Sequence, residues 1–280
     1  MRASVQPDSS LVSYQLVLAD THQPEQRHHL SLNPFLGHQL SIQWSGLVFC
    51  QHCHRKSRKS YGQGYCYPCF TRLAQCDTCM MAPERCHFHL ESCREPEWAE
   101  QVCFQPHYIY LANTSGIKVG ITRATQLPVR WLDQGACQAI PLAQVTNRRL
   151  SGLVEDRVRQ QMSDKTNWRQ MLKGNPPECE LVDIRDDVIA QLREPLEALA
   201  EPFGQGALQW SHDVASQFDY PVLSYPTRVS SLNLDKTSQI DGRLMGIKGQ
   251  YLLLDTGVIN LRRFSGYEVS FNLQPNETEY

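Results

Sequence analysis

The sequence predicts an α+β protein built from several modules. Two observations carry this expectation: segments near both ends alternate apolar and polar residues, as strands do, and nine of the eleven cysteines fall between Cys50 and Cys103. The chain of 280 residues also exceeds the size at which a single core is usual. We expect N-terminal β strands in 1–49, a cysteine-rich zinc-binding module in 50–106, an α/β domain in 107–205 and a β-rich domain in 206–280.

The N-terminal strands are expected in residues 11–18 and 39–44, where apolar and polar side chains alternate. The cysteines that follow read Cys50-x2-Cys53-x12-Cys66-x2-Cys69. A tight Cys-x2-Cys turn points two sulfurs the same way, so two such pairs present four thiolates to one tetrahedral Zn²⁺. The helix formers after Cys66 predict that the second pair lies at a helix N-terminus, which describes a treble-clef-like finger.

A disulfide framework is the competing interpretation of these cysteines, and it requires an oxidising compartment. Residues 1–20 contain neither an apolar core of a signal peptide nor a small-residue cleavage site. We therefore expect a cytoplasmic protein with reduced thiols. No stretch of the sequence reaches the roughly 20 apolar residues that cross a bilayer, so we also expect a soluble protein without a membrane partner.

A second zinc site is expected in the rest of the cysteine-rich block. The pair Cys76 and Cys79 opens this cluster, and Cys86 and Cys93 are the preferred further ligands. His89 or Cys103 are the substitutes. A histidine in this segment is at least as often a polar surface group or a partner of a ligand as a ligand itself.

The first finger is basic although the whole chain has a formal net charge of −2. Between Cys50 and Gln75 there is no acidic residue, and the candidates for phosphate contact are Arg55, Lys56, Arg58 and Lys59. A simply solvated run of basic residues is the equally weighted alternative.

The central segment predicts a hairpin followed by helices. Residues 108–112 and 117–122 form the expected strands, with a turn at 113–116. Pro128 begins an expected helix, and Ser151 is the expected cap of another. Beyond residue 220, short strands separated by glycine turns predict a small β barrel or sandwich, which we expect to pair with the N-terminal strands because neither segment alone carries a large core.

The hairpin from Tyr108 to Thr122, followed by Arg130 and Glu155, resembles the core of the GIY-YIG nuclease superfamily. The resemblance implies that Tyr110, with Tyr108 as the alternative register, orients the attacking water. It also implies that Arg130 stabilises charge on the phosphorane and that Glu155 holds a catalytic Mg²⁺.

Lys118 stands where the second motif tyrosine is expected, as in a lysine-bearing branch of the superfamily. It is a candidate phosphate contact or base, with a solvated strand lysine as the alternative. Arg123 is placed at the mouth of the proposed site, where it would contact nucleic acid.

The whole chain also resembles a bacterial family of unknown function with a cysteine-rich zinc module followed by a GIY-YIG-like domain, through segments 63–69, 118–123 and 164–168. The expected function is that of a zinc-containing nucleic-acid-binding protein, for DNA or RNA, with a Mg²⁺-dependent phosphodiesterase unit. The alternative is a non-catalytic zinc protein that binds nucleic acid or a protein partner. A third possibility is an enzyme acting on a small phosphate-bearing ligand.

Overall fold

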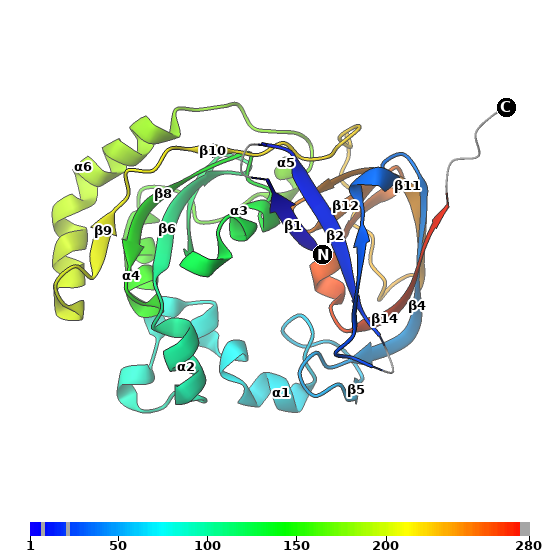
Figure 1. The fold of residues 1–280 in the computed structure, drawn as a ribbon, viewed down its shortest axis with the longest axis horizontal. Helices are drawn as coiled ribbons and strands as arrows, with labels where there is room; N and C mark the ends of the chain where they lie inside the picture. Colours follow the sequence, from blue (N-terminus) through cyan, green and yellow to red (C-terminus); the bar gives the residue numbers. More distant parts are fainter. Residues whose placement is uncertain (7–8, 21–22, 275–280) are drawn as a thin grey trace. The chain divides into compact units, whose positions relative to one another are not determined.

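The computed structural model describes residues 1–6, 9–20 and 23–274 and divides the chain into two compact units. The first unit comprises residues 1–71, 172–174 and 219–280, and the second comprises 72–171 and 175–218. Each unit has its own sheets, shown in Figure 1.

The first unit begins with a three-stranded antiparallel sheet of β1 (Arg2–Val5), β2 (Val12–Ala19) and β3 (Arg27–Ser31). In β2, buried Val12, Tyr14 and Leu16 alternate with exposed residues, as the sequence pattern predicts.

A second sheet in this unit combines the two ends of the sequence. Its strand order is β13-β12-β11-β4-β14, and β5 pairs with β4. The bounds are β4 (Gln39–Phe49), β5 (Lys56–Ser57), β11 (Gln239–Lys248), β12 (Tyr251–Leu254), β13 (Gly257–Asn260) and β14 (Tyr267–Gln274).

Strand β4 lies between two C-terminal strands, and Ile42 is opposite both Ile240 of β11 and Phe271 of β14. The expected pairing of N-terminal and C-terminal strands is therefore confirmed. The expected C-terminal barrel is wrong, because the strands of the described residues form an open sheet that ends at β13 and β14. In a barrel built from the C-terminal segment alone, β11 and β14 would pair with other C-terminal strands. Here the long strand β4 pairs with both of them.

The cysteine-rich region contains short elements only. Helix α1 (Tyr67–Arg72) carries Cys69, and α2 (Pro96–Cys103) ends the region. Between them lie the 3-10 helices η2 (Ala74–Cys76), η3 (Thr78–Met80), η4 (Pro83–Arg85) and η5 (Phe88–Leu90). The other 3-10 helices of the described residues are η1 (Asn33–Phe35), η6 (Ala124–Gln126), η7 (Glu201–Phe203) and η8 (Leu261–Phe264).

The second unit is built on an antiparallel sheet of order β10-β8-β6-β7, with β9 also paired to β8. Its strands are β6 (His107–Asn113), β7 (Ile117–Arg123), β8 (Gln138–Val145), β9 (Leu208–Trp210) and β10 (Ser216–Gln217). The expected hairpin is present, since β6 pairs with β7 from His107 opposite Arg123 to Asn113 opposite Ile117.

Helices α4 (Arg148–Val158) and α6 (Leu181–Ala200) lie beside this sheet (Figure 1). Alternate residues of β6, including Ile109 and Leu111, form one core with Val154 of α4 and Leu192 of α6. Burial of this apolar surface fixes α4 against the sheet. The remaining helices are α3 (Val129–Asp133) and α5 (Trp168–Met171).

The start of α4 differs from the expectation. The cap is Asn147, whose side-chain oxygen accepts from the Leu150 N–H at 3.0 Å, and Ser151 lies inside the helix with its hydroxyl bonded to the Arg148 carbonyl at 2.7 Å.

Among the helices in the described parts of the chain, none combines the length and the apolar character that spanning a membrane requires.

Candidate functional site

The first four cysteines of the pattern converge in the first unit. The sulfurs of Cys50, Cys53, Cys66 and Cys69 all lie within 4.8 Å of one another, and the Cys53 and Cys66 sulfurs are 3.7 Å apart. Four sulfurs at about 2.3 Å from a central Zn²⁺ in a tetrahedron are roughly 3.8 Å from each other. The four thiols therefore fit a tetrahedral zinc ion, and the sequence-based expectation of a four-cysteine zinc-binding site is supported.

Local backbone structure explains why these thiols meet. The Cys50 N–H donates to the Arg55 carbonyl at 2.9 Å and the Cys50 carbonyl accepts from the His54 N–H at 2.9 Å, which closes the turn between the first two cysteines. His54 has a φ of 57°, in the left-handed region. The second pair flanks the start of α1, as the proline at position 68 predicts.

The electrostatics of this site favour a bound cation. Burial opposes ionisation of Cys50, but backbone N–H groups of Cys53, Cys66 and His52 lower its pKa to about 6. Burial and the neighbouring thiols raise the pKa of Cys69. The Cys50 thiolate therefore forms readily whereas Cys69 resists a further negative charge, a conflict that a divalent metal removes.

The basic residues of the finger lie in the sequence between Cys53 and Cys66, the second and third cysteines of this site. Arg55, Lys56, Arg58 and Lys59 are all exposed, and the Lys59 ammonium lies 4.8 Å from the centre of the Tyr61 ring. Exposure leaves their charges accessible to an anionic surface.

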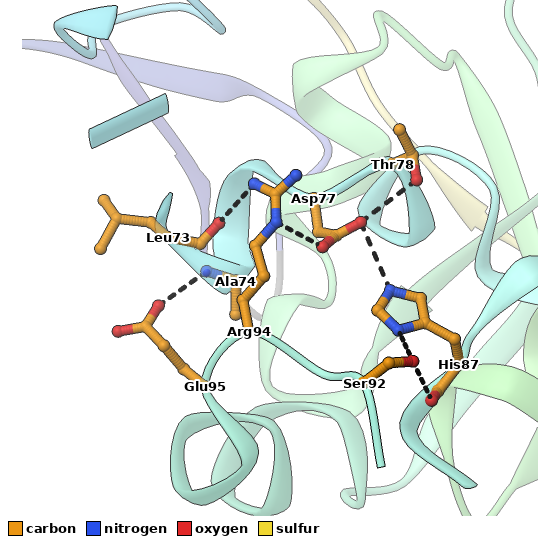
Figure 2. A network of polar contacts seen from close by, with 8 residues as sticks. All are labelled: Leu73, Ala74, Asp77, Thr78, His87, Ser92, Arg94 and Glu95. Carbon is orange, nitrogen blue, oxygen red and sulfur yellow. Dashed lines mark hydrogen bonds and ion pairs between the residues drawn. The ribbon is translucent and has the colours of Figure 1, made fainter. Parts of the chain in front are cut away.

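A second group of potential ligands lies in the second unit. Asp77, Cys79 and His87 place ligand atoms within 4.8 Å of one another. Figure 2 shows that Asp77 belongs to a polar network: its carboxylate accepts from Arg94 Nε at 2.7 Å and from the Thr78 hydroxyl at 3.1 Å, and it lies 3.6 Å from His87 Nε2. The largest influence on Asp77 is burial, which opposes ionisation, but its hydrogen bonds and Arg94 lower its pKa overall.

The expected ligands of the second zinc are partly gathered here. Cys79, Cys86 and Cys93 line one cavity in this unit, as does the expected substitute Cys103. Cys76 and His89 are not among the residues that line it.

The residues of the nuclease-like motif lie on β6, β7, α3 and α4. In the hairpin, Tyr110 is opposite Gly120 and Ala112 is opposite Lys118. A Cβ atom on Gly120 would lie 2.6 Å from the Tyr110 hydroxyl oxygen, so only glycine leaves room for this ring. The spacing of the motif thus has a packing cause.

Tyr110 has no exposed surface, and its hydroxyl donates to Gln134 Oε1 at 2.9 Å. Burial raises the pKa of Tyr110; the negative charge of Glu155 adds to this effect, whereas Arg130 opposes it by charge and by a hydrogen bond. Tyr110, Arg130 and Glu155 are therefore within interaction range of one another.

Lys118 and Glu155 are the two ionisable groups of this cluster with the largest functional interest. Lys118 is buried and Glu155 is half-buried. Burial lowers the pKa of Lys118 to about 8, and Arg130 acts in the same direction while Glu155 and Asp164 oppose it. Burial raises the pKa of Glu155 to about 7 against the positive charges of Lys118 and Arg130. Both groups consequently change charge near neutral pH.

Two further residues belong to this cluster beyond the expected ones. Gln134 follows Arg130 by four residues, a spacing that places both on one side of a helix, and it accepts the hydrogen bond from Tyr110. The backbone carbonyl of Asp164 accepts from Lys118 Nζ at 3.2 Å. Asp164 opens the segment 164–168 that carries the family resemblance, but its local pattern does not indicate that the loop after α4 brings it to β7.

The remaining expected residues lie close by. Tyr108 is on the same face of β6 as Tyr110, two residues earlier, and is half-buried. Arg123, also half-buried, acts electrostatically on Cys103, His107 and Arg148.

Comparison of the chain with curated proteins and with solved structures found no match. Comparison with protein families found one described as "Protein of unknown function (DUF2797)", which matches residues 37–269. This range contains both cysteine clusters and the Tyr110–Glu155 cluster, and it covers most of the 280 residues. The chain therefore belongs to the DUF2797 family of unknown function, as its resemblance to a family without an assigned activity led us to expect.

Proposed function

We propose that this protein is a zinc-containing phosphodiesterase that acts on nucleic acid, with a GIY-YIG-like catalytic unit. The observation that carries the proposal is the convergence of the buried Lys118 and the half-buried Glu155, both with pKa values moved toward neutrality, on Arg130. Tyr110 also interacts with Arg130 and Glu155. Groups whose pKa values are shifted by burial together with specific charged partners are candidates for a functional site, and general acid–base catalysis is most effective when the pKa lies near the working pH.

Lys118 is the proposed proton acceptor. With a pKa of about 8, a tenth or so of its amine is neutral near pH 7 and able to take a proton from an attacking water. The resulting hydroxide adds to phosphorus as the P–O bond to the leaving group breaks, and the leaving oxygen takes its proton from solvent water. Lys118 is 5% exposed, and its Nζ donates to the Asp164 carbonyl at 3.2 Å.

Arg130 is the proposed stabiliser of negative charge on the non-bridging oxygens. Its guanidinium is half-buried, and its planar fork of donors matches the geometry of phosphate oxygens. Tyr110 is a positioning residue in this scheme, since its buried hydroxyl contacts Arg130 and Gln134 rather than solvent. The half-buried Tyr108 is the tyrosine that remains available to substrate.

Glu155 is the proposed ligand of a catalytic Mg²⁺, with Asp164 near it. One or two carboxylates are the usual protein contribution to a Mg²⁺ that also binds substrate phosphate and water, so these residues fit that ion. Bound there, Mg²⁺ would supply Lewis-acid polarisation of the phosphate. Glu155 would be held in its ionised form by such a cation.

Nucleic acid is the proposed substrate because the first unit presents four exposed basic residues, Arg55, Lys56, Arg58 and Lys59, next to the four-cysteine site. A folded zinc finger holds such side chains on a defined surface, where they contact phosphates without reading sequence.

The test is a cleavage assay of zinc-loaded protein with Mg²⁺ or Mn²⁺ on labelled single-stranded, duplex and branched DNA and on RNA. We expect cleavage of at least one substrate and its loss in Arg130→Ala, by roughly 10²-fold or more. Arg157→Ala, an exposed change on α4, is the matched control and retains activity. If no substrate is cleaved but one is bound, the protein is a non-catalytic nucleic-acid-binding module instead.

A further inference from the structure

Three aromatic rings of the basic finger form one cluster. The centre of the Tyr61 ring lies 5.4 Å from that of Tyr67 and 6.0 Å from that of Phe70. These separations are in the range of favourable aromatic pairs. All three residues belong to the first unit, as the four-cysteine site does.

The turn that carries Tyr61 fixes the position of the cluster. Tyr61 and Tyr65 exchange two backbone hydrogen bonds, of 2.8 and 2.9 Å, which close the turn between them. A Cβ atom on Gly62 would lie 2.8 Å from the Phe70 ring, so this ring packs directly on the backbone of the turn. Ring packing therefore joins the turn to helix α1, which carries Phe70.

Tyr67 is the exposed member of the cluster. It is 59% exposed, whereas Tyr61 and Phe70 are half-buried. Its neighbour Cys66 is buried in the four-cysteine site, which holds this end of α1 in place. A single exposed tyrosine is ordinary on a protein surface. Here an aromatic cluster and a metal-binding residue both hold the ring, so Tyr67 presents a planar apolar face to solvent at a fixed position.

Positive charge adjoins the cluster from two segments of the chain. The Lys59 ammonium lies 4.8 Å from the centre of the Tyr61 ring, within the range of a cation–π contact. Arg262 of η8 donates from its Nε to Gln63 Oε1, in the turn, at 3.0 Å. The other basic residues of the finger precede Lys59 in the sequence and are exposed. The surroundings of the rings therefore attract anions.

A planar ring beside cations matches the chemistry of single-stranded nucleic acid. The phosphates of such a strand bind to basic side chains, and its unpaired bases stack on aromatic rings. Within a duplex each base is stacked between its neighbours and cannot use the ring. An acidic peptide satisfies the cations but does not require an exposed aromatic face. The combination on the finger therefore favours a single strand.

We propose that Tyr67, supported by Tyr61 and Phe70, stacks on an unpaired base of single-stranded nucleic acid whose phosphates contact the basic residues of the finger. This role rests on the proposed function, since it takes nucleic acid as the ligand. It adds that the ligand is single-stranded and is held by its bases as well as by its backbone. Stacking of this kind accepts any base, because every base has an aromatic face.

The experiment measures binding by fluorescence anisotropy with zinc-loaded full-length protein and without Mg²⁺, so that cleavage is not required. The probes are oligothymidylate, an abasic strand with the same number of phosphates, and a duplex of the same length. We expect oligothymidylate to bind more tightly than the abasic strand, by roughly 5- to 100-fold. Tyr67→Ala should abolish this preference and Tyr67→Trp should keep it. The salt slope should stay unchanged in Tyr67→Ala, because no phosphate contact is removed.

Leu223→Ala is the matched control, because Leu223 is an equally exposed apolar residue of the first unit, at 60%. It should bind all three probes as the wild type does. If Tyr67→Ala loses its zinc, photochemical cross-linking of the wild type to an iodouracil-substituted strand decides. Cross-links to Tyr67 support the proposal, and cross-links confined to other parts of the chain contradict it.

Equal affinity of the wild type for oligothymidylate and the abasic strand would overturn stacking and leave phosphate binding intact. An unchanged preference in Tyr67→Ala, or tighter binding of polyglutamate than of the strand, would also overturn it. Single-strand binding that depends on Tyr67, without cleavage once Mg²⁺ is added, supports this inference and removes only the catalytic part of the proposed function. Failure to bind any nucleic acid overturns both.

Discussion

At the scale of single residues, Glu155 and Lys118 are placed at a cost to stability. Burial disfavours the charged form of each, and their mutual attraction only partly offsets this, since the pKa of Glu155 remains raised to about 7 and that of Lys118 remains lowered to about 8. Replacement of a buried ion pair by well-packed apolar residues is often neutral or stabilising. Retention of two titrating groups is what a proton-transfer site requires.

Glu155→Gln is expected to stabilise the protein while abolishing its activity. The folded pKa of Glu155 exceeds its ordinary value of 4.5, so the native state binds more protons than the unfolded state between about pH 4.5 and pH 7, and stability falls as pH rises through that window. Because glutamine does not titrate, the variant does not lose this stability as the pH rises. We expect no gain near pH 4 and a gain of roughly 1–3 kcal/mol near pH 8. Guanidinium unfolding in Mg²⁺-free buffer measures it.

The exposed Glu194 provides the control for this experiment. Glu194→Gln should leave stability unchanged at both pH values. A pH-independent effect of Glu155→Gln would mean that Glu155 is ionised without strain in the folded protein, against the raised pKa.

Lys118→Arg is expected to show whether Lys118 acts through its positive charge or as a proton acceptor. Arginine keeps the positive charge but does not lose its proton, so the cleavage rate should fall by roughly 10²-fold while nucleic-acid affinity is retained. The wild-type rate should rise with pH up to about 8, where Lys118 becomes neutral. The exposed Lys165→Arg is the control. Full activity of Lys118→Arg would exclude Lys118 as the proton acceptor.

Sequence spacing predicted the first metal site because the geometry of Cys-x2-Cys is local. The second cavity was not predictable in the same way: its cysteines are separated by six, six and nine residues, and only the folding of η3 to α2 brings them together. Cys76 and Cys79 form the more recognisable pair, although Cys76 is not among the residues that line the cavity. The burial of Tyr110 could not be predicted from the sequence either, since it depends on Gln134 and on packing by distant chain segments.

At the scale of elements, helix α4 joins the cysteine-rich segment to the candidate catalytic cluster. Gly152 on α4 faces η4, where an added Cβ would lie 2.5 Å from the Glu84 backbone nitrogen. Glu155 follows less than one turn later. Close packing at Gly152 therefore sets the position of the Glu155 carboxylate.

Gly152→Ala is expected to destabilise the protein even though alanine is the better helix former. The intrinsic preference favours alanine by about 1 kcal/mol, but the clash with backbone at η4 forces a shift that costs roughly 1–3 kcal/mol. Thermal unfolding temperature and cleavage rate should both fall. Arg157→Ala on the exposed side of α4 controls for changes in helix propensity. A stabilised and fully active Gly152→Ala would show that η4 does not constrain α4.

The hairpin of β6 and β7 followed directly from alternation and turn residues, because both signals are local. The pairing of N-terminal with C-terminal strands was also predicted, but the open sheet was not, because strand order and register depend on contacts between distant segments of the chain. The Asn147 cap was also missed in favour of Ser151, which lies four residues later on the buried side of α4.

At the scale of the whole molecule, each compact unit carries its own cysteine cluster, and the basic finger belongs to the first unit. Neutralising Arg55, Lys56, Arg58 and Lys59 together should weaken nucleic-acid binding. The slope of log affinity against log salt should fall by up to about 0.9 for each phosphate that the variant no longer binds. Fluorescence anisotropy at several salt concentrations measures this slope.

A matched variant removes four other exposed basic residues of the first unit: Arg2, Arg27, Lys236 and Arg243. It has the same change in net charge and should keep the wild-type slope. Equal slopes in the two variants would mean that net charge, and not the finger, governs binding.

Hydrolysis of phosphodiesters by the Tyr110–Glu155 cluster is tested most directly by one cleavage measurement. Zinc-loaded wild-type protein and Glu155→Gln are compared on the same panel of labelled DNA and RNA, with and without Mg²⁺. We expect Mg²⁺-dependent cleavage by the wild type, none by Glu155→Gln, and equal binding by both. Cleavage that persists in Glu155→Gln, or no cleavage by the wild type on any substrate, would contradict a catalytic role for this cluster.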